Sequence, residues 1–153
     1  MTVRYFFGLV LSVIFILFTC FVSGFGDYFL FLLDVSSLII VIIIPLVFMG
    51  IFYGWKKFAL AFSALSKKND NKNSLMESKV FFENYGKVLF TVAFVAFILS
   101  FMAMMRNLEN REALGPNMAI AAIQLLYAGL INLVVIIPSK IFIKIKITEI
   151  ENK

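Results

Sequence analysis

Four long stretches of the sequence contain no charged side chain, and each is about as long as a membrane-spanning helix. They run over residues 5–23, 37–55, 88–105 and 118–137. A helix needs about 20 mainly apolar residues to cross the hydrocarbon core of a bilayer, and charged residues oppose its insertion. The runs lack the alternation of polar and apolar residues that marks barrel strands. We therefore predict an all-α membrane protein with four transmembrane helices.

The composition excludes several other classes of protein. The chain has 153 residues and is 62% hydrophobic with 19 Phe, whereas soluble domains are about 45–50% apolar. The single cysteine, Cys20, excludes a disulfide framework, and the absence of histidine removes the commonest metal ligand and the usual general base. There are no paired carboxylates near a span and no Gly-rich phosphate loop. We expect no enzyme activity, no cofactor, no metal site and no nucleic-acid partner.

The run at 5–23 has two interpretations, a removable signal peptide or a retained anchor. Arg4 precedes it, and Leu17–Cys20 (LFTC) faintly resembles a lipoprotein cleavage site. However, the run exceeds the roughly 7–15 apolar residues of a signal peptide, and Phe-Thr stands where small residues are required. We expect a retained anchor.

Lysines are concentrated in two of the segments outside the runs, and they predict the orientation. The middle loop and the tail carry Lys56, Lys57, Lys67, Lys68, Lys72, Lys79, Lys87, Lys140, Lys144, Lys146 and Lys153. The first outer loop has no lysine or arginine, and it contains Asp27 and Asp34. Because cytoplasmic loops carry an excess of Lys and Arg, we expect both termini in the cytoplasm.

The segments between the spans complete a single membrane domain at 1–153. The sequence of residues 56–87 predicts a short cytoplasmic helical hairpin with a polar turn at KKNDNKNS. Residues 106–117 predict a polar outer turn, whose charged residues keep it in water. The alternating Ile and Lys of the tail, KIFIKIKITEIENK, predict a strand or a membrane-surface segment.

Small residues form stripes on the predicted spans. Helices pack closely in lipid where small residues let their backbones approach. The candidates are Ala93, Ala96, Ser100 and Ala103 in the third span, Gly50 and Gly54 in the second, and Ala119, Ala122 and Gly129 in the fourth. These stripes pack the helices of one subunit, or some of them face other subunits or a guest helix.

A second face of the fourth span carries polar side chains. Gln124, Ala128 and Asn132 recur every four residues, with Tyr127 beside them. A carboxamide without hydrogen-bond partners in an apolar medium loses several kcal/mol, so both amides should point inward. They form an interhelical clamp or line a hydrated path, and we favour the clamp. No span contains an Asp or Glu, which disfavours a small multidrug exporter and any carboxylate relay within this chain.

The stretch NLENREALGPNMA at 107–119 and the run that follows it resemble a known junction between two membrane helices. They are similar to the third-to-fourth helix junction of the MotA/TolQ/ExbB proton-channel family, closest to MotA-type flagellar stator subunits. The matching residues are Asn107, Leu108, Leu114, Gly115, Pro116, Met118, Ala119, Tyr127 and Pro138, together with DVSSLIIV at Asp34–Val41 and the Trp55-Lys56-Lys57 exit of the second span.

This resemblance implies a ring of four-helix subunits, with five members, in the bacterial cytoplasmic membrane. It also implies a single-span partner of the MotB/ExbD type, whose helices the ring encloses and which supplies the essential membrane Asp. Gly115-Pro116 would start the fourth span, because Pro is preferred in the first turn of a helix.

The sequence departs from the family pattern at the positions that line the ring. Phe90 and Phe97 stand where the family has a Pro and a Thr, and Gln124 and Leu125 replace paired threonines. The cytoplasmic segment at 56–87 is also much shorter than in MotA-type subunits. We therefore expect an accessory subunit of such an ion-channel or motor complex. The alternatives are a non-conducting membrane scaffold or assembly factor and a holin-like pore.

Overall fold

The computed structural model describes residues 34–65, 71–106, 108–109 and 111–152, together with residues 7, 8, 10, 11, 13, 14 and 18. The elements of the continuous ranges are α2 (Val35–Tyr53), α3 (Trp55–Ser63), α4 (Lys72–Met105), α5 (Arg111–Ile131), the π-helical turn η2 (Asn132–Ile136) and α6 (Ile137–Glu151). The all-helical prediction is confirmed for the described residues. The predicted first span at 5–23 lies mostly outside them, as does the first half of the predicted turn KKNDNKNS at 67–70. The second half of that turn is the cap residue Asn71 and the start of α4.

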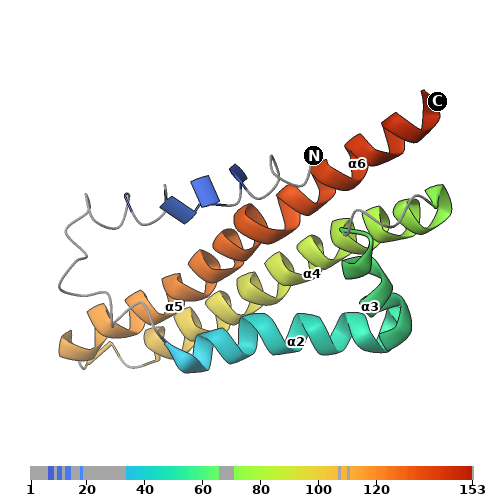
Figure 1. Ribbon diagram of the computed structural model, residues 1–153. Helices are drawn as coiled ribbons and strands as arrows, with labels where there is room; N and C mark the ends of the chain where they lie inside the picture. The colour runs from blue at the N-terminus through green and yellow to red at the C-terminus, as the bar shows by residue number, and fades with distance from the viewer. Residues whose placement is uncertain are drawn as a thin grey trace.

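Two long antiparallel rods form the body of the fold (Figure 1). One is α4, and the other runs without a break through α5, η2 and α6. An ion pair of 2.8 Å between Lys72 Nζ and Glu151 Oε1 joins the first residue of α4 to the last of α6. At about 1.5 Å per residue, the 34 residues of α4 span about 51 Å. The hydrocarbon core of a bilayer is about 30 Å thick, so the rods are longer than a membrane crossing requires.

Helix α2 packs against α4 and α5 through one narrow stripe. Ser37, Val41, Pro45 and Met49 recur every four residues and are all buried. Asp34 caps the helix, because its side chain accepts a hydrogen bond of 3.1 Å from the Ser37 N–H. The rest of α2 presents exposed apolar side chains, namely Val35, Ile39, Ile43, Ile44, Val47, Phe48, Ile51 and Phe52.

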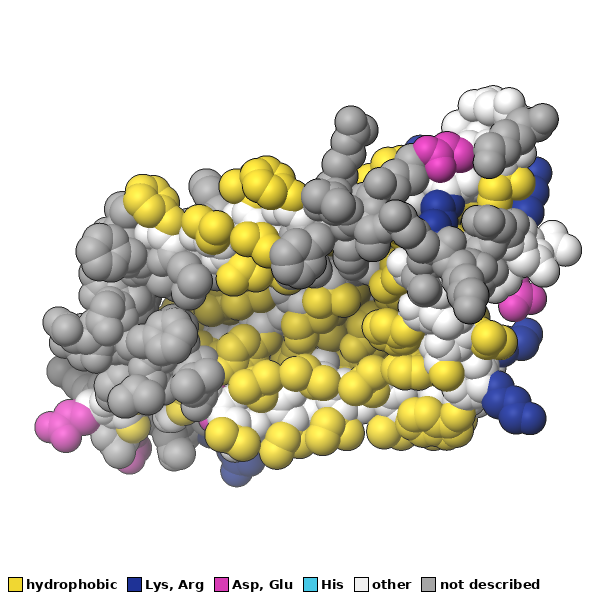
Figure 2. Space-filling model, in the orientation of Figure 1, with side chains coloured by type: hydrophobic (Ala, Val, Ile, Leu, Met, Phe, Trp, Pro, Cys, Tyr) yellow, Lys and Arg dark blue, Asp and Glu magenta, His cyan; other side chains and the backbone are white. Residues whose placement is uncertain are grey.

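A broad apolar surface surrounds the described helices. Three helical segments, Val35–Tyr53, Lys72–Met105 and Glu112–Glu151, are long and apolar enough to cross a membrane. Figure 2 shows their apolar side chains as a band with charged side chains at its two ends. Only 17% of the most apolar window of α4 is buried, and a water-soluble monomer rarely exposes an apolar patch of this extent. The fold therefore supports a membrane protein.

The first arm of the predicted hairpin at 56–87 is a helix separate from α2. Gly54 ends α2 with a positive φ of 79°, and α3 then turns back to pack on α4 (Figure 1). Aromatic side chains fill the junction. The Phe58 and Phe81 rings pack edge-to-face with their centroids 5.4 Å apart. Phe81 and Phe82 pack in the same way with a centroid distance of 5.5 Å. Edge-to-face pairs of this kind stabilise a core beyond their buried area.

Two boundaries predicted from the sequence are wrong. Helix α5 begins at Arg111, so Leu114, Gly115, Pro116 and Met118 lie inside the helix and not in an outer turn at 106–117. Glu112 in the first turn favours this early start, because a negative charge stabilises a helix N-terminus. Pro116 therefore does not open the helix.

The tail is helical, so the strand alternative is wrong, and Pro138 does not end the fourth helix. Extending an existing helix adds one hydrogen bond per residue without a new nucleation step. The β-branched tail residues therefore continue the rod that α5 begins.

Gly54 gives a test of the turn between α2 and α3. Its φ of 79° and ψ of 138° lie in a region that essentially only glycine adopts. We expect Gly54→Ala to lower the free energy of unfolding by about 1–3 kcal/mol, measured by thermal unfolding in detergent. The control is Gly115→Ala, which lies in α5 with open space around it and should be neutral or stabilising by up to about 1 kcal/mol. Equal free energies of unfolding for the two variants would show that Gly54 does not adopt this glycine-specific conformation.

Candidate functional site

Gly86 of α4 faces η2 with little space between the two rods. A Cβ atom added at Gly86 would lie 3.2 Å from Ile136 Cγ2 and 3.4 Å from Asn132 Oδ1. Gly86 is buried, as is Ile136. A side chain at this position would therefore have to displace the π-helical turn or its neighbours.

The turn η2 interrupts the α-helical hydrogen bonding of the second rod. The Ile137 N–H donates to Asn132 O, five residues back. Pro138 follows directly, and it has no N–H and would crowd the carbonyl four residues before it in an α-helix. A wider turn relieves that crowding. The Ser139 hydroxyl donates to Val135 O at 2.6 Å, which satisfies a carbonyl group in the altered segment.

An open pocket of about 420 Å³ lies beside this close approach. It is lined by Glu83, Gly86, Lys87 and Phe90 of α4 and by Asn132 and Lys140 of the second rod. We call it the π-turn pocket. It combines one carboxylate, one carboxamide and two ammonium groups at the end of the uncharged stretch of α4. Such a set favours an anionic group from a partner, because the two lysines outnumber the one glutamate. Among the described residues, no group of His, Cys, Asp or Glu is able to hold a metal ion.

Gln124 does not line the π-turn pocket. Its side chain lies between the two rods and is hydrogen-bonded there. It is 4% exposed, and its Nε2 donates to Ser100 Oγ of α4 at 3.2 Å. This is the geometry that the clamp interpretation predicts. A polar pair of this kind stabilises packed membrane helices by about 0.6–2 kcal/mol.

Tyr127 ties α5 to the start of α2. Its buried hydroxyl accepts a hydrogen bond of 3.0 Å from the Asp34 N–H. Asp34 also accepts from the Ser37 hydroxyl. The backbone donor that precedes α2 is therefore satisfied within the chain, as a nonpolar surrounding requires.

The remaining residues of the predicted helix faces differ in how deeply they are buried. Ala93 and Ala128 are fully buried in the core. Ala96 and Ser100 are half-buried, while Ala103 is exposed. The stripe on the third span therefore does not lie against one neighbour along its whole length.

The glycines of the second span do not form a helix-packing motif. Gly50 is buried against Trp55 of its own chain, whose ring carbon would lie 2.7 Å from an added Cβ. Gly54 lies outside α2 and allows the chain to turn. Their spacing reflects a local bend, so the helix-packing prediction is wrong for this pair.

Three functional positions escaped sequence reasoning. Gly86 carries a weak signal, because it is the only glycine in the predicted return segment. Asp34 carries a stronger one, since an Asp followed three residues later by Ser at the head of an apolar run predicts a helix cap. Lys146 carries none. The residue is 8% exposed, and its amino group donates to Ala64 O at the end of α3 at 3.3 Å, above the Phe142 ring.

The fold and the pocket define a helical protein with three helical segments long and apolar enough to cross a membrane, a close glycine contact between two rods and a polar pocket at the end of an apolar stretch. Comparison of the sequence and the structure with protein-family models, curated proteins and solved structures finds no match.

Replacing Gly86 tests the close approach. We expect Gly86→Leu to lower stability by about 1–3 kcal/mol, because extra methylenes in a packed contact force neighbours apart. Unfolding in mixed detergent micelles measures the change. Gly115→Leu is the matched control, since an added Cβ there meets nothing within 4 Å. A Gly86→Leu protein as stable as the control would show that the rods lie further apart.

A double-mutant cycle tests the pairing of Gln124 with Ser100. We expect Gln124→Leu and Ser100→Ala to be coupled by about 0.6–2 kcal/mol in the free energy of unfolding. The control pairs Gln124→Leu with Thr91→Val, because the Thr91 hydroxyl bonds only to Lys87 O of its own helix. That pair should be additive within about 0.3–0.5 kcal/mol. Additivity of the Gln124–Ser100 pair would leave both groups free for other partners.

Proposed function

We propose that the protein is a MotA/TolQ/ExbB-like membrane subunit of an oligomeric ion-channel or motor complex, in an accessory role. It has four spans with both termini in the cytoplasm of a bacterium, and it assembles around the helix of a single-span partner. The observation that carries the proposal is a pair of long apolar rods with no carboxylate in their spans and a polar pocket at one end.

The distribution of charge supports the orientation. Lys56, Lys57, Lys87, Lys140 and Lys144 all follow or precede the apolar stretches at the same end of the rods. The other end has no lysine; it carries Asp34, Glu109 and Glu112 with Arg106 and Arg111, so its charges nearly balance. Because lysine and arginine remain on the cytoplasmic side, the π-turn pocket would lie at the cytoplasmic end of the membrane.

The exposed face of α5 supports assembly with other polypeptides. Ala119 and Ala122 are exposed, and a Cβ at Gly129 would meet nothing within 4 Å. In lipid, helices associate where small residues permit close backbone contact. These small residues offer a packing surface to a helix of another subunit or of the partner.

The absence of acid in the spans supports a partner that supplies one. None of the four apolar runs contains Asp or Glu, so a titrating carboxyl must come from outside this chain. The π-turn pocket offers Asn132, Lys87 and Lys140 to such a group at the cytoplasmic end.

A non-conducting scaffold is the second candidate. It is favoured by the hydrogen bonds of Gln124 and Tyr127, which lie within the subunit. Phe90 is 47% exposed beside the pocket, where a hydrated path would need polar groups. Co-reconstitution with the partner separates the candidates, because only a conducting complex would dissipate a proton gradient across vesicles.

Native mass spectrometry of the nanodisc-extracted protein tests the proposal. We expect several copies of this chain together with a single-span protein, and we expect Ala122→Leu to reduce the copy number by filling the exposed face of α5. Ala59→Leu is the control, because Ala59 is an exposed alanine on α3 outside the apolar runs. A wild-type monomer without a single-span companion would contradict the proposal.

A further inference from the structure

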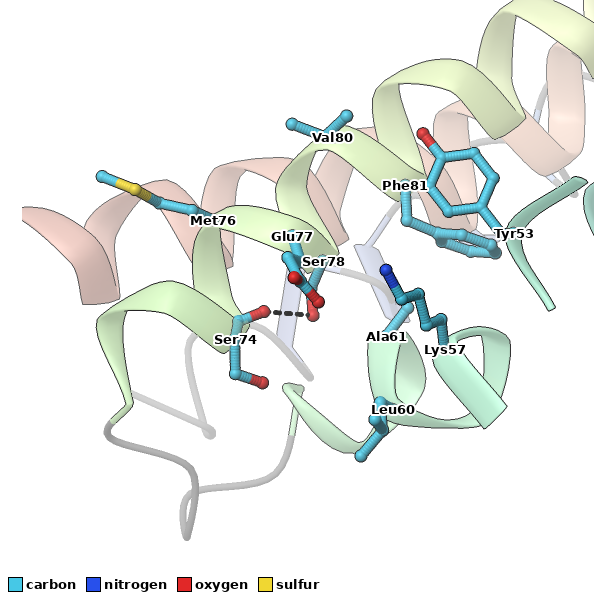
Figure 3. Close-up of a pocket in the computed structure, with 10 residues that line it drawn as sticks. All are labelled: Tyr53, Lys57, Leu60, Ala61, Ser74, Met76, Glu77, Ser78, Val80 and Phe81. Carbon is cyan, nitrogen blue, oxygen red and sulfur yellow. Dashed lines mark hydrogen bonds between the residues drawn. The ribbon is translucent and has the colours of Figure 1, made fainter. Parts of the chain in front are cut away.

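A second pocket of about 290 Å³ lies between α3 and the first turns of α4 (Figure 3). Its walls come from the end of α2, from α3 and from α4. Most of the lining is apolar, with Leu60 and Ala61 on one side and Val80 and Phe81 on the other. It is distinct from the π-turn pocket, with which it shares no residue.

Two opposite charges enter this pocket from facing helices. Figure 3 shows the Lys57 amino group of α3 and the Glu77 carboxylate of α4 directed into the space between the two helices. The ion pair of the described residues joins Lys72 to Glu151, so Lys57 and Glu77 line the same cavity without pairing with each other. The Ser78 hydroxyl is already occupied, because it donates to Ser74 O at 2.8 Å.

The pocket adjoins the end of the second apolar run, which is where we place the lipid headgroups. Tyr53 and Trp55 end the apolar run of α2, and Trp55 is 61% exposed. Tyr and Trp are enriched where hydrocarbon gives way to headgroups. Lys57 follows two residues later and Glu77 faces it, so both charges stand just outside the apolar band.

We propose that this pocket binds the headgroup of a phospholipid that carries a phosphate and a primary ammonium, as in phosphatidylethanolamine. The phosphate pairs with Lys57, and the ammonium donates hydrogen bonds to Glu77. The apolar wall contacts the glycerol and the first methylenes. Pockets for small ligands measure about 300–1,000 Å³, so this cavity suits a headgroup, while the acyl chains remain in the membrane.

The two charges select among headgroups. The hydroxyl groups of phosphatidylglycerol donate hydrogen bonds to Glu77 but bring no positive charge, so the net negative headgroup leaves the charge of Glu77 uncompensated. The quaternary ammonium of phosphatidylcholine is unable to donate a hydrogen bond to Glu77. Of the three headgroups, only the primary ammonium brings both a positive charge and N–H donors to Glu77. The inference does not depend on the proposed complex, because one chain provides the whole pocket.

The test is lipid retention in native mass spectrometry, with the protein in nanodiscs of equal parts phosphatidylethanolamine, phosphatidylglycerol and phosphatidylcholine. We expect wild type to retain phosphatidylethanolamine preferentially. Lys57→Gln should weaken its retention about tenfold, as expected when one charge-assisted hydrogen bond is lost. Glu77→Gln should weaken it similarly and abolish the preference over phosphatidylglycerol.

The controls are Lys56→Gln and Glu149→Gln, exposed charges of the same types outside the pocket, which should change retention less than about twofold. Thermal unfolding of each variant in nanodiscs without phosphatidylethanolamine confirms its fold. Equal retention of the three lipids by wild type would overturn the proposal. So would a dependence on Lys57 alone with phosphatidylglycerol preferred, which would define a site for anionic lipids.

Discussion

In hydrocarbon every polar group must find its partner within the protein, and this constraint accounts for how the described helices meet. Gln124 meets Ser100 between the rods, Tyr127 accepts from the Asp34 N–H, and the Ser139 hydroxyl donates to Val135 O of its own helix. No hydrophobic drive brings helices together in such a solvent. The contacts therefore concentrate where small residues and paired polar groups allow them, as where Gly86 faces η2.

The two pockets lie towards the same lysine-rich end of the molecule, but their lining residues differ in chemical type. The π-turn pocket opens where two lysines, one glutamate and Asn132 surround a gap between the rods. The pocket between α3 and α4 has an apolar lining with one charge of each sign. A protein partner that brings an acidic group suits the first, and a zwitterionic lipid suits the second. The aromatic cluster around Phe81 lies between α3 and α4 and stiffens the wall of the lipid pocket.

The sequence was sufficient for the features that follow from periodicity and charge. The helical class follows from uncharged runs of membrane length, and the second run at 37–55 lies within two residues of α2 at Val35–Tyr53. The sequence did not predict that the second rod is continuous. Taken locally, Gly115, Pro116 and Pro138 each indicate the end of a helix. Tertiary contacts and the widened turn override those signals. The contact of Lys146 with Ala64 joins residues 82 positions apart, and no local pattern records such a pairing.

The π-helical turn also fixes the rotational register of α6. A π-turn holds about one residue more than an α-turn, and each α-helical residue accounts for about 100° of rotation. Loss of a single residue from Asn132–Ile136 would therefore swing the whole of α6 by more than a quarter turn about its axis. Lys146 would leave the end of α3, and Glu151 would no longer face Lys72. The length of this short segment, more than its chemistry, decides which side of α6 the rest of the protein meets.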